Sequence, residues 1–284
     1  MSFERRLRPG RSSPVESMRA LGLVLAALAA AGVWAALYLD LSPGGLWPGR
    51  GGLRLAGEFF GRAFSPALRF EGPYAGDTLS LPLQALGAAF NTVVFAAAAL
   101  SLALLGGLAL GFLGSSTWWD RGPGRAVTAA ARLFMALMRS VHELVWAVLL
   151  LAAFGTSHLA AVFAIAIPYA GTLGKVFAEM IDEAPRDAAD ALGQSGANAL
   201  QCFACGLLPR AAPDMTAYTF YRFECALRSS AVLGFFGFPT LGYYIAASFE
   251  NLYYGEVWTY LYVLFALIAG VDWWSSRLRR EVLA

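Results

Sequence analysis

The chain has 284 residues, of which 58% are hydrophobic and only 14% are charged, with a formal net charge of +2 at pH 7. The charged fraction is about half that of an average soluble protein. This composition indicates a membrane protein, and the small net charge argues against a nucleic-acid-binding protein.

The first apolar stretch, at 18–39, is long enough to cross the roughly 30 Å hydrocarbon core of a bilayer. A signal peptide is the alternative, but the stretch is too long for the usual apolar region and no small-residue cleavage site precedes Asp40. We therefore predict a retained span. Between 40 and 82, apolar residues alternate with Arg54, Glu58 and Arg62, which predicts a short amphipathic helix at the outer membrane surface.

Five further apolar stretches predict an all-α membrane protein with about six transmembrane helices. They lie at 83–113, 127–154, 158–180, 212–236 and 257–275. Six spans put both termini on one side of the membrane. Arginines fall on that same side at three places: Arg5, Arg6, Arg8 and Arg11; Arg121 and Arg125; and Arg277, Arg279 and Arg280. The positive-inside rule makes that side the cytoplasm.

This topology divides the chain into three parts. Residues 1–80 are predicted to hold an N-terminal cytoplasmic segment, the first span and the external amphipathic segment. Residues 81–276 form a core domain with a cytoplasmic loop at 181–210, and residues 277–284 form a cytoplasmic tail.

The loop at 181–210 carries a polar island with a definite spacing. It reads Asp190-Ala191-Leu192, three residues, Gly196, nine residues, Gly206, one residue, Leu208-Pro209. Gly193 and Gly196 are predicted to allow a sharp bend, because glycine tolerates positive φ. Leu208-Pro209 is predicted to end the helix before it and redirect the chain into the next span. An ordinary amphipathic loop helix is the alternative.

Ionisable residues inside predicted spans are rare and indicate function. Arg139 and Glu143 are four apart on one span, as are Glu224 and Arg228 on another, so each pair can share a helix face and neutralise itself. Arg222 has no such partner and lies about 15 Å into its span, near the middle of the membrane. A guanidinium there suits a tetrahedral oxyanion. Pairing between helices, for example of Arg222 with Glu143, is the alternative.

Other polar residues complete a candidate path for a solute. Ser229 and Ser230 follow Arg228 with hydroxyl groups, and Asn91 either lines the path or hydrogen-bonds between helices. Phe238-Pro239-Thr240 is predicted to form a gate, with a tight turn at the outer surface as the alternative. Cys202 and Cys205 form a C-x-x-C without a second pair, so no metal site is predicted.

The polar island resembles the cytoplasmic coupling motif of ABC importer permeases. In that motif an acid-Ala-Ala triplet is followed at the same spacing by Gly, Ile and Leu-Pro; here Leu192 replaces the second alanine and Gly206 the isoleucine. The segments 139–146 and 221–234 look like segments of phosphonate-importer permeases, and the resemblance covers roughly residues 80–275. Phe238-Pro239-Thr240 departs from an Ala-Gly-Gly that such permeases often have.

The resemblance implies a type I ABC importer permease of the bacterial inner membrane, carrying phosphonate, phosphite or hypophosphite by alternating access. It also implies a second permease subunit, identical or homologous, two ATPase subunits and a periplasmic substrate-binding protein, with membrane lipid around the assembly. ATP and Mg²⁺ are expected in the ATPase, since this chain has no G-x-x-x-x-G-K-[ST] loop and no cofactor of its own is expected. The residues expected to couple to the ATPase are Asp190, Ala191, Leu192, Gly196, Leu208 and Pro209.

Three alternatives remain. An importer for an amino acid or oligopeptide is compatible with the coupling spacing alone. A secondary transporter or channel predicts inverted repeats, which the hydropathy pattern does not show. An intramembrane enzyme predicts paired carboxylates or a nucleophile with its base at one depth, and none are found in the predicted spans.

Overall fold

The computed structural model describes residues 14–41, 49–72, 80–117, 124–198 and 201–283. Five arginines used for the predicted topology lie outside these residues: Arg5, Arg6, Arg8, Arg11 and Arg121. Two positions of the 181–210 loop, 199 and 200, also lie outside them. The chain forms two compact units, one of residues 1–59 and one of residues 60–284.

The first unit contains the helix α1, Pro14–Tyr38, whose segment Leu21–Tyr38 is apolar enough to cross a membrane. The helix α2, Arg50–Arg62, starts in this unit and ends in the next. It confirms the helix predicted in this part of the chain. On it, Arg54 and Glu58 lie one turn apart with 3.7 Å between their charged groups.

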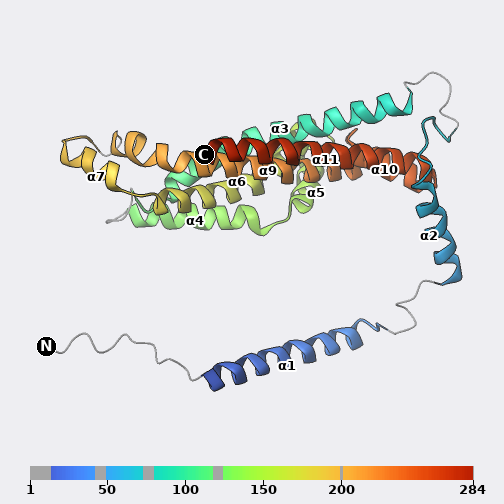
Figure 1. Cartoon of the computed structure of the whole chain (residues 1–284), viewed down its shortest axis with the longest axis horizontal. Helices are drawn as coiled ribbons and strands as arrows, with labels where there is room; N and C mark the ends of the chain where they lie inside the picture. The colour runs from blue at the N-terminus through green and yellow to red at the C-terminus, as the bar shows by residue number, and fades with distance from the viewer. Residues whose placement is uncertain (1–13, 42–48, 73–79, 118–123, 199–200, 284) are drawn as a thin grey trace. The chain divides into compact units, whose positions relative to one another are not determined.

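The second unit is built around four long helices that run along one another, α3, α6, α9 and α11 (Figure 1). Their bounds are Leu81–Gly114, His158–Glu183, Leu208–Val232 and Tyr254–Leu283. Shorter elements connect them: α4 Gly124–Ser140, α5 Glu143–Phe154, α7 Asp187–Gln194, the π-helix η2 Cys202–Leu207, the 3₁₀-helix η3 Leu233–Phe236 and α10 Leu241–Glu250.

Glycines allow α3 and α6 to pack closely and in the same direction. A Cβ on Gly107 would lie 2.6 Å from the Cβ of Leu173, and one on Gly111 would lie 2.9 Å from the Cβ of Phe177. Such distances leave no room for a side chain, so the two backbones touch only because these positions are glycine. Close approach through small residues is how helices associate in membranes, where apolar burial supplies little attraction.

The predicted span at 127–154 is wrong as a continuous helix. It is two helices, α4 and α5, that meet at an angle of 87°. The break falls at Val141 and His142, and His142 caps α5 by accepting a hydrogen bond from the backbone N–H of Leu144 at 3.3 Å. Four helices are long and apolar enough to cross a membrane, or up to six if each of two bent helix pairs counts as one span.

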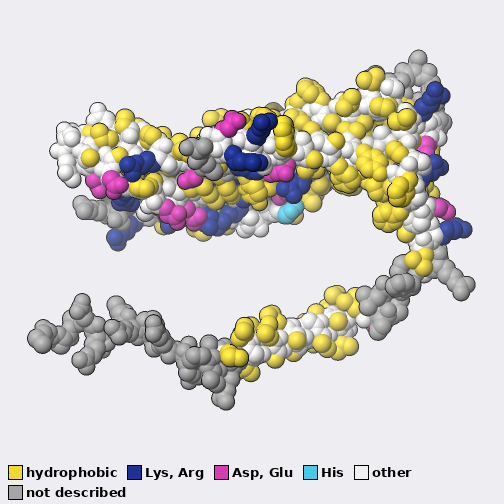
Figure 2. Space-filling view, in the orientation of Figure 1, with side chains coloured by type: hydrophobic (Ala, Val, Ile, Leu, Met, Phe, Trp, Pro, Cys, Tyr) yellow, Lys and Arg dark blue, Asp and Glu magenta, His cyan; other side chains and the backbone are white. Residues whose placement is uncertain are grey.

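Charged side chains are not spread evenly over the second unit. On the face in view, Figure 2 shows hydrophobic side chains over α10 and the first half of α11; charged side chains lie over the part of the bundle toward α7, and a few more lie at the opposite tip. In α11 the stretch 257–271 contains no charged residue. This uncharged part of the bundle has the character of a surface facing hydrocarbon.

Candidate functional site: a coupling segment and a charged cluster

The coupling segment consists of α7, a turn at Gly196 and η2. Gly196 has a φ of +90°, in the region that favours glycine, which confirms the predicted bend at this position. Gly193 does not adopt a positive φ, so of these two glycines only Gly196 forms the bend. The chain therefore folds back on itself, and η2 returns along α7.

Gly206 explains how closely the two arms of this segment pack. A Cβ at Gly206 would lie 2.7 Å from the Cα of Ala189 and 2.8 Å from its backbone nitrogen. Ala189 is buried by the contact. Any side chain at position 206 would push η2 away from α7.

Leu208-Pro209 does not end a helix, contrary to the prediction. η2 runs directly into α9, which starts at Leu208 with proline in its first turn. Proline lies at the junction where the π-helical bonds of η2, such as that from the Leu208 N–H to the Phe203 carbonyl, give way to the α-helical winding of α9. The coupling segment is therefore continuous with the long helix α9.

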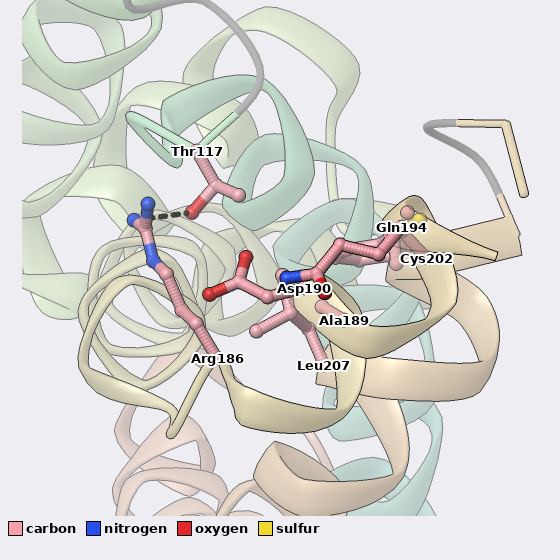
Figure 3. Close-up of a pocket in the computed structure, with 9 residues that line it drawn as sticks. Thr117, Arg186, Ala189, Asp190, Gln194, Cys202 and Leu207 are labelled. Atoms are coloured by element: carbon pink, nitrogen blue, oxygen red, sulfur yellow. Dashed lines mark hydrogen bonds between the residues drawn. The ribbon is translucent and has the colours of Figure 1, made fainter. Parts of the chain in front are cut away.

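The exposed side of the segment borders a hollow of about 540 Å³. Asp190 and Ala191 are exposed, while Leu192 and Leu208 are half-buried and point partly into the fold. Figure 3 shows the Asp190 carboxylate and the Arg186 guanidinium turned toward the same space, with Arg186 donating to the Thr117 hydroxyl at 3.4 Å. The hollow thus presents groups of both charges on the surface of the coupling segment.

Asp182, which the sequence interpretation did not single out, ties three elements together beside this segment. Its carboxylate accepts hydrogen bonds from the Ser115 hydroxyl at 2.7 Å, the Ser116 N–H at 2.9 Å and the Thr117 hydroxyl at 3.1 Å. It also pairs with Arg132 at 3.0 Å. The end of α6 is thereby fixed to the end of α3 and to α4.

The predicted pairing of Arg139 with Glu143 is wrong because the helix breaks between them. Arg139 ends up in the last turn of α4, and Glu143 starts α5. Glu143 instead accepts a hydrogen bond from the Ser229 hydroxyl at 2.8 Å and lies 3.6 Å from the imidazole of His142. Arg139 lines a different hollow between α4 and α6.

The predicted pairing of Glu224 with Arg228 is also wrong. Glu224 is buried and pairs with Arg279 of α11 at 2.9 Å, while Arg228 is exposed and, among the residues that the structure describes, has a polar contact only with the Cys225 sulfur, at 3.9 Å. Arg279 was predicted to lie in the cytoplasm and Arg222 in the middle of the membrane. Because Arg279 pairs with Glu224, two residues from Arg222, the two arginines cannot lie at such different depths. The uncharged stretch 257–271 favours a position of the cluster toward the α7 end.

Arg222 is held by tyrosines rather than by an acid. Its Nε and one terminal nitrogen donate to the Tyr218 hydroxyl at 2.9 and 2.6 Å. Its guanidinium carbon lies 5.2 to 5.9 Å from the ring centres of Tyr169, Tyr218 and Tyr221. No ion pair joins Arg222 to Glu143 or to any other described residue, so its charge is balanced only by aromatic faces and one hydroxyl.

A chain of hydrogen bonds runs beside Arg222. The hydroxyls of Tyr169 and Ser229 lie 3.0 Å apart, and Ser229 donates to Glu143, so Tyr169 donates to Ser229. Ser230 differs from its neighbour: it is fully buried and donates to the backbone carbonyls of Thr92 and Leu227. Ser229 therefore belongs to the polar cluster, whereas Ser230 serves helix packing.

The candidate gate is a turn between η3 and α10. Phe238 is buried, with its ring 5.6 Å from that of Phe95 and 6.1 Å from that of His158. The Pro239 carbonyl accepts a hydrogen bond from the Asn91 side chain at 3.1 Å, and the Thr240 hydroxyl donates to the Ala231 carbonyl at the end of α9 at 3.1 Å. Asn91 thus links α3 to this turn.

Several members of the cluster had no signal in the sequence. Tyr169 and Tyr218 lie in stretches that read as parts of spans, where tyrosine carries no formal charge to mark it. Arg279 was visible as a basic residue, but its partner 55 residues away could not be read from helical spacing. In the sequence, the position of Asp182 just after a predicted span was the clearest indication of its contact with the Ser115–Thr117 turn.

Comparison with known proteins identifies the family. Residues 107–282 match the model of the binding-protein-dependent transport system inner membrane component. The chain belongs to this family. It is therefore an integral membrane component of a transport system, as the coupling spacing predicted.

Relatives in this family bear names that concern phosphorus oxyanions. The chain is 34% identical over 161 residues to a putative phosphite transport system permease protein of Stutzerimonas stutzeri, covering 57% of this chain and 62% of that one. It is 32% identical over 194 residues to a phosphite transport system permease protein of the same organism, covering 67% and 68%. A phosphate-import permease protein of Mycolicibacterium smegmatis is 30% identical over 195 residues, covering 69% and 36%.

Solved structures confirm the predicted fold. An inward-facing MetNI methionine ABC transporter matches with a TM-score of 0.62 and 19% identity, covering 70% of this chain and 96% of that chain. An amino acid ABC transporter matches with a TM-score of 0.59 and 17% identity, covering 70% and 94%. The family's helical bundle is thus the fold of ABC importer permeases.

Proposed function

We propose that this chain is the transmembrane subunit of an ATP-driven importer for phosphite, phosphonate or a closely related small phosphorus oxyanion. The observation that carries the proposal is the likeness to two phosphite permeases and one phosphate-import permease at 30 to 34% identity. The likeness to the methionine and amino acid transporters is lower, at 17 to 19%, and concerns the fold.

Arg222 is the residue best suited to meet such an anion. A guanidinium has five N–H donors. Two hydrogen bonds to Tyr218 use two of them, and five minus two leaves three without a partner among the described residues. Arginine donors match the oxygens of a tetrahedral oxyanion in geometry and charge. The tyrosine faces hold the guanidinium in place without neutralising it, so it remains able to attract an anion.

The path also contains groups that could accept a proton or repel a second anion. Glu143 lies at the end of the Tyr169–Ser229 hydrogen-bond chain, close to the break between α4 and α5. Asn91 and the Phe238–Thr240 turn would form the constriction beyond this cluster, where the Asn91 side chain holds the Pro239 carbonyl. Glu224, paired with Arg279, fixes α11 to α9 and keeps an uncompensated charge out of the path.

Coupling to ATP would occur through the segment at 187–207. This part of the chain has no phosphate-binding loop of its own, and the segment's exposed residues Asp190 and Ala191 offer a surface for a separate ATPase subunit. Two ATPase subunits, with ATP and Mg²⁺, would move the segment on each of two permease subunits. Because η2 is continuous with α9, a displacement of the segment would move Arg222, fourteen residues into α9, directly.

The proposed orientation has both termini in the cytoplasm of a bacterial cell, with the inner membrane around the bundle and a periplasmic binding protein delivering cargo. The charged α7 end would then face the cytoplasm, and the turn at Phe238 would lie toward the periplasm. Alternating access follows if ATP-driven movement of α7 opens and closes the two ends in turn.

Uptake by the reconstituted complex tests the proposal. The chain, its ATPase and its binding protein would be assembled in liposomes, and ATP-dependent uptake of radiolabelled phosphite would be measured against competing methylphosphonate, hypophosphite, phosphate and methionine. We expect competition by phosphorus oxyanions and none by methionine. Uptake of methionine but not of any phosphorus oxyanion would contradict the proposal.

A further inference from the structure

A cavity of about 280 Å³ lies at the end of the bundle opposite α7, where α10 and the start of α11 pack against α3 (Figure 1). It lies away from Arg222 and from the coupling segment. Among the described residues that line it, one is an acid, Glu256, and none is a lysine, arginine or histidine. Its lining also includes four tyrosines: Tyr243, Tyr244, Tyr253 and Tyr260.

Three of these tyrosine rings are packed against one another. The ring centres of Tyr243 and Tyr244 lie 5.2 Å apart with the planes nearly perpendicular, and Tyr244 stacks on Tyr260 at 5.4 Å. The Tyr260 hydroxyl donates to the side-chain oxygen of Gln84 on α3 at 2.7 Å, which fixes its ring between α3 and α11. The face of an aromatic ring carries partial negative charge and attracts a cation. The tyrosine wall of the cavity is therefore ordered before any ligand binds, and it favours positive charge.

Glu256 adds a buried carboxylate to this wall. Its side chain accepts hydrogen bonds from the Ser248 hydroxyl at 2.9 Å and the Glu71 N–H at 2.6 Å, and the residue is only 5% exposed. A carboxylate offers about four acceptor positions, so about two remain. The N-terminus of α11 offsets part of the charge.

No full positive charge balances Glu256. It forms no ion pair with any described lysine, arginine or histidine. The sequence 73–79, which precedes α3 and lies outside the described residues, contains no basic residue either. A buried charge without a counter-ion is costly, so a cation that enters the cavity gains a partner already in place.

The lining distinguishes between kinds of ligand. An anion would meet a carboxylate and ring faces, and both repel it. A hard metal ion such as Ca²⁺ takes six to eight oxygen ligands, whereas this wall offers one carboxylate that already accepts two hydrogen bonds. An organic ammonium ion uses both features of the wall, because a carboxylate offsets its charge and aromatic rings contact its N–H or N–CH₃ groups.

We propose that this cavity binds the ammonium group of a small organic cation, with Glu256 as its counter-ion and the rings of Tyr243 and Tyr244 as its contact surface. Tyr260 stacks against Tyr244 and positions it. The walls come from α3, α10 and α11, so the bound cation links three helices at this end of the bundle. The ammonium group belongs to a free small molecule or to a lipid head group, and the experiment separates these two sources.

Binding of radiolabelled choline to the full chain, purified in a detergent without an ammonium group, tests the proposal. We expect saturable binding that tetramethylammonium displaces. The uncharged isostere of choline, 3,3-dimethylbutanol, should displace it far less, because it matches choline in shape but not in charge.

Variants locate the site. Glu256→Gln is expected to weaken choline binding by roughly tenfold or more, since it removes the counter-ion. Tyr244→Leu removes a ring but retains Glu256, and is expected to weaken binding by about threefold to thirtyfold. Glu250→Gln is the matched control, because Glu250 is an exposed acid on α10 that does not line the cavity, and its affinity should equal that of the wild type. Circular dichroism and gel filtration of each variant check that it is folded.

A comparison of nanodiscs identifies the source of the ammonium group. Choline binding in phosphatidylglycerol nanodiscs but not in phosphatidylcholine nanodiscs would support a lipid head group as the occupant, whereas binding in both would support a free cation.

Three outcomes would overturn the proposal. They are the absence of saturable binding of choline and tetramethylammonium, equal displacement by 3,3-dimethylbutanol, and unchanged affinity in both Glu256→Gln and Tyr244→Leu. None of these measurements involves cargo or an ATPase, so the proposed transport function is tested separately.

Discussion

Arg222 and Glu224 lie two residues apart on α9 but are stabilised in opposite ways. Glu224 has a full opposite charge at 2.9 Å, whereas Arg222 has only tyrosine rings and the Tyr218 hydroxyl. A paired charge is a poor binding group because its partner must first be displaced. The residue without an ionic partner is therefore the better candidate for contact with an anion.

Arg222→Gln is expected to reduce phosphite uptake by roughly tenfold to a hundredfold, the loss that corresponds to a charged hydrogen bond of about 1.5–3 kcal/mol. Initial uptake rates over a range of phosphite concentrations would measure the change. Arg54→Gln serves as the control, because Arg54 is an exposed arginine on α2, outside the predicted spans. Equal uptake by the wild type and Arg222→Gln would remove Arg222 from the path.

Glu224→Gln is expected to lower the stability of the complex by about 2 kcal/mol, because it leaves the partly buried Arg279 without its ionic partner. Thermal unfolding of the complex in detergent would measure the loss. The double variant Glu224→Gln/Arg279→Gln should recover much of it, since no charge is then left alone. A double variant as unstable as the sum of the two single variants would argue against the pair.

For single residues, the sequence shows which side chains carry charge but not which of them are in contact. Four-residue spacing correctly indicates the pair of Lys175 with Glu179, which meet at 3.2 Å, but the two pairs predicted inside the spans both failed for physical reasons. The first failed because a helix break at Val141 and His142 separates its members, and the second because α11 brings Arg279 to Glu224. Contacts between distant helices depend on packing, which local spacing does not contain.

The two arms of the coupling segment, α7 and η2, pack closely because Gly206 has no side chain. The segment can present Asp190 to a partner only if η2 lies flat on α7. A larger residue at 206 would separate the arms and change the surface that they form, while leaving the membrane helices intact.

Gly206→Val is therefore expected to abolish co-purification of the ATPase while the permease still accumulates in the membrane. Affinity purification of the tagged chain, with the ATPase quantified in the eluate, provides the measurement. Gly193→Ala is the matched control, because a Cβ there meets only the Cys202 sulfur at 3.7 Å, an ordinary contact. Normal ATPase recovery with Gly206→Val would show that the close packing of these arms is dispensable.

The predictions of helices and bends were confirmed where residue composition determines the local structure, and were wrong where packing against other helices determines it. Long apolar stretches located α1, α3, α6, α9 and α11, and the glycine at 196 located the bend of the coupling segment. The right-angle break in the 127–154 stretch was missed, since an apolar sequence looks the same in a straight and a broken span. Pro209 was predicted to end a helix, but it lies at the junction of η2 and α9, through which the helix continues.

For the molecule as a whole, Asp182 fixes the end of α6 that leads into the coupling segment. It joins the end of α6, five residues before α7, to α3 and α4 through four hydrogen-bonding groups. A displacement of α7 would therefore move the ends of α3, α4 and α6 together.

Asp182→Asn is expected to reduce uptake at least several-fold while much of the ATP hydrolysis of the complex remains, because an amide cannot satisfy all the donors that the carboxylate accepts. Uptake and ATP hydrolysis would be measured in the same liposomes, and their ratio is the informative quantity. Asp272→Asn, an exposed acid on α11, controls for the loss of a negative charge. A parallel decline of both activities would indicate a merely structural role.

At this scale the spacing of the polar island was enough to anticipate the type of machine, and family membership confirmed it. The spacing follows from the structure, because a bend at Gly196, a close packing at Gly206 and the helix that begins at Leu208 each need a particular residue at its position. The proposed cargo site was harder to anticipate, because the neighbours of Arg222 and Glu224 come from α6 and α11 as well as α9.

The π-helical geometry of η2 has a consequence for how this permease can change. A π-helix holds an extra residue in its turn, and η2 passes without interruption into α9. Deleting one residue between 202 and 207 would restore α-helical winding, and because an α-turn closes with one residue fewer than a π-turn, the docking surface would keep its direction relative to α9. A deletion within the regular α-helical part of α9 would instead rotate everything before it by about 100°. η2 is thus a place where the chain can lose a residue without turning the docking surface away from a motor subunit.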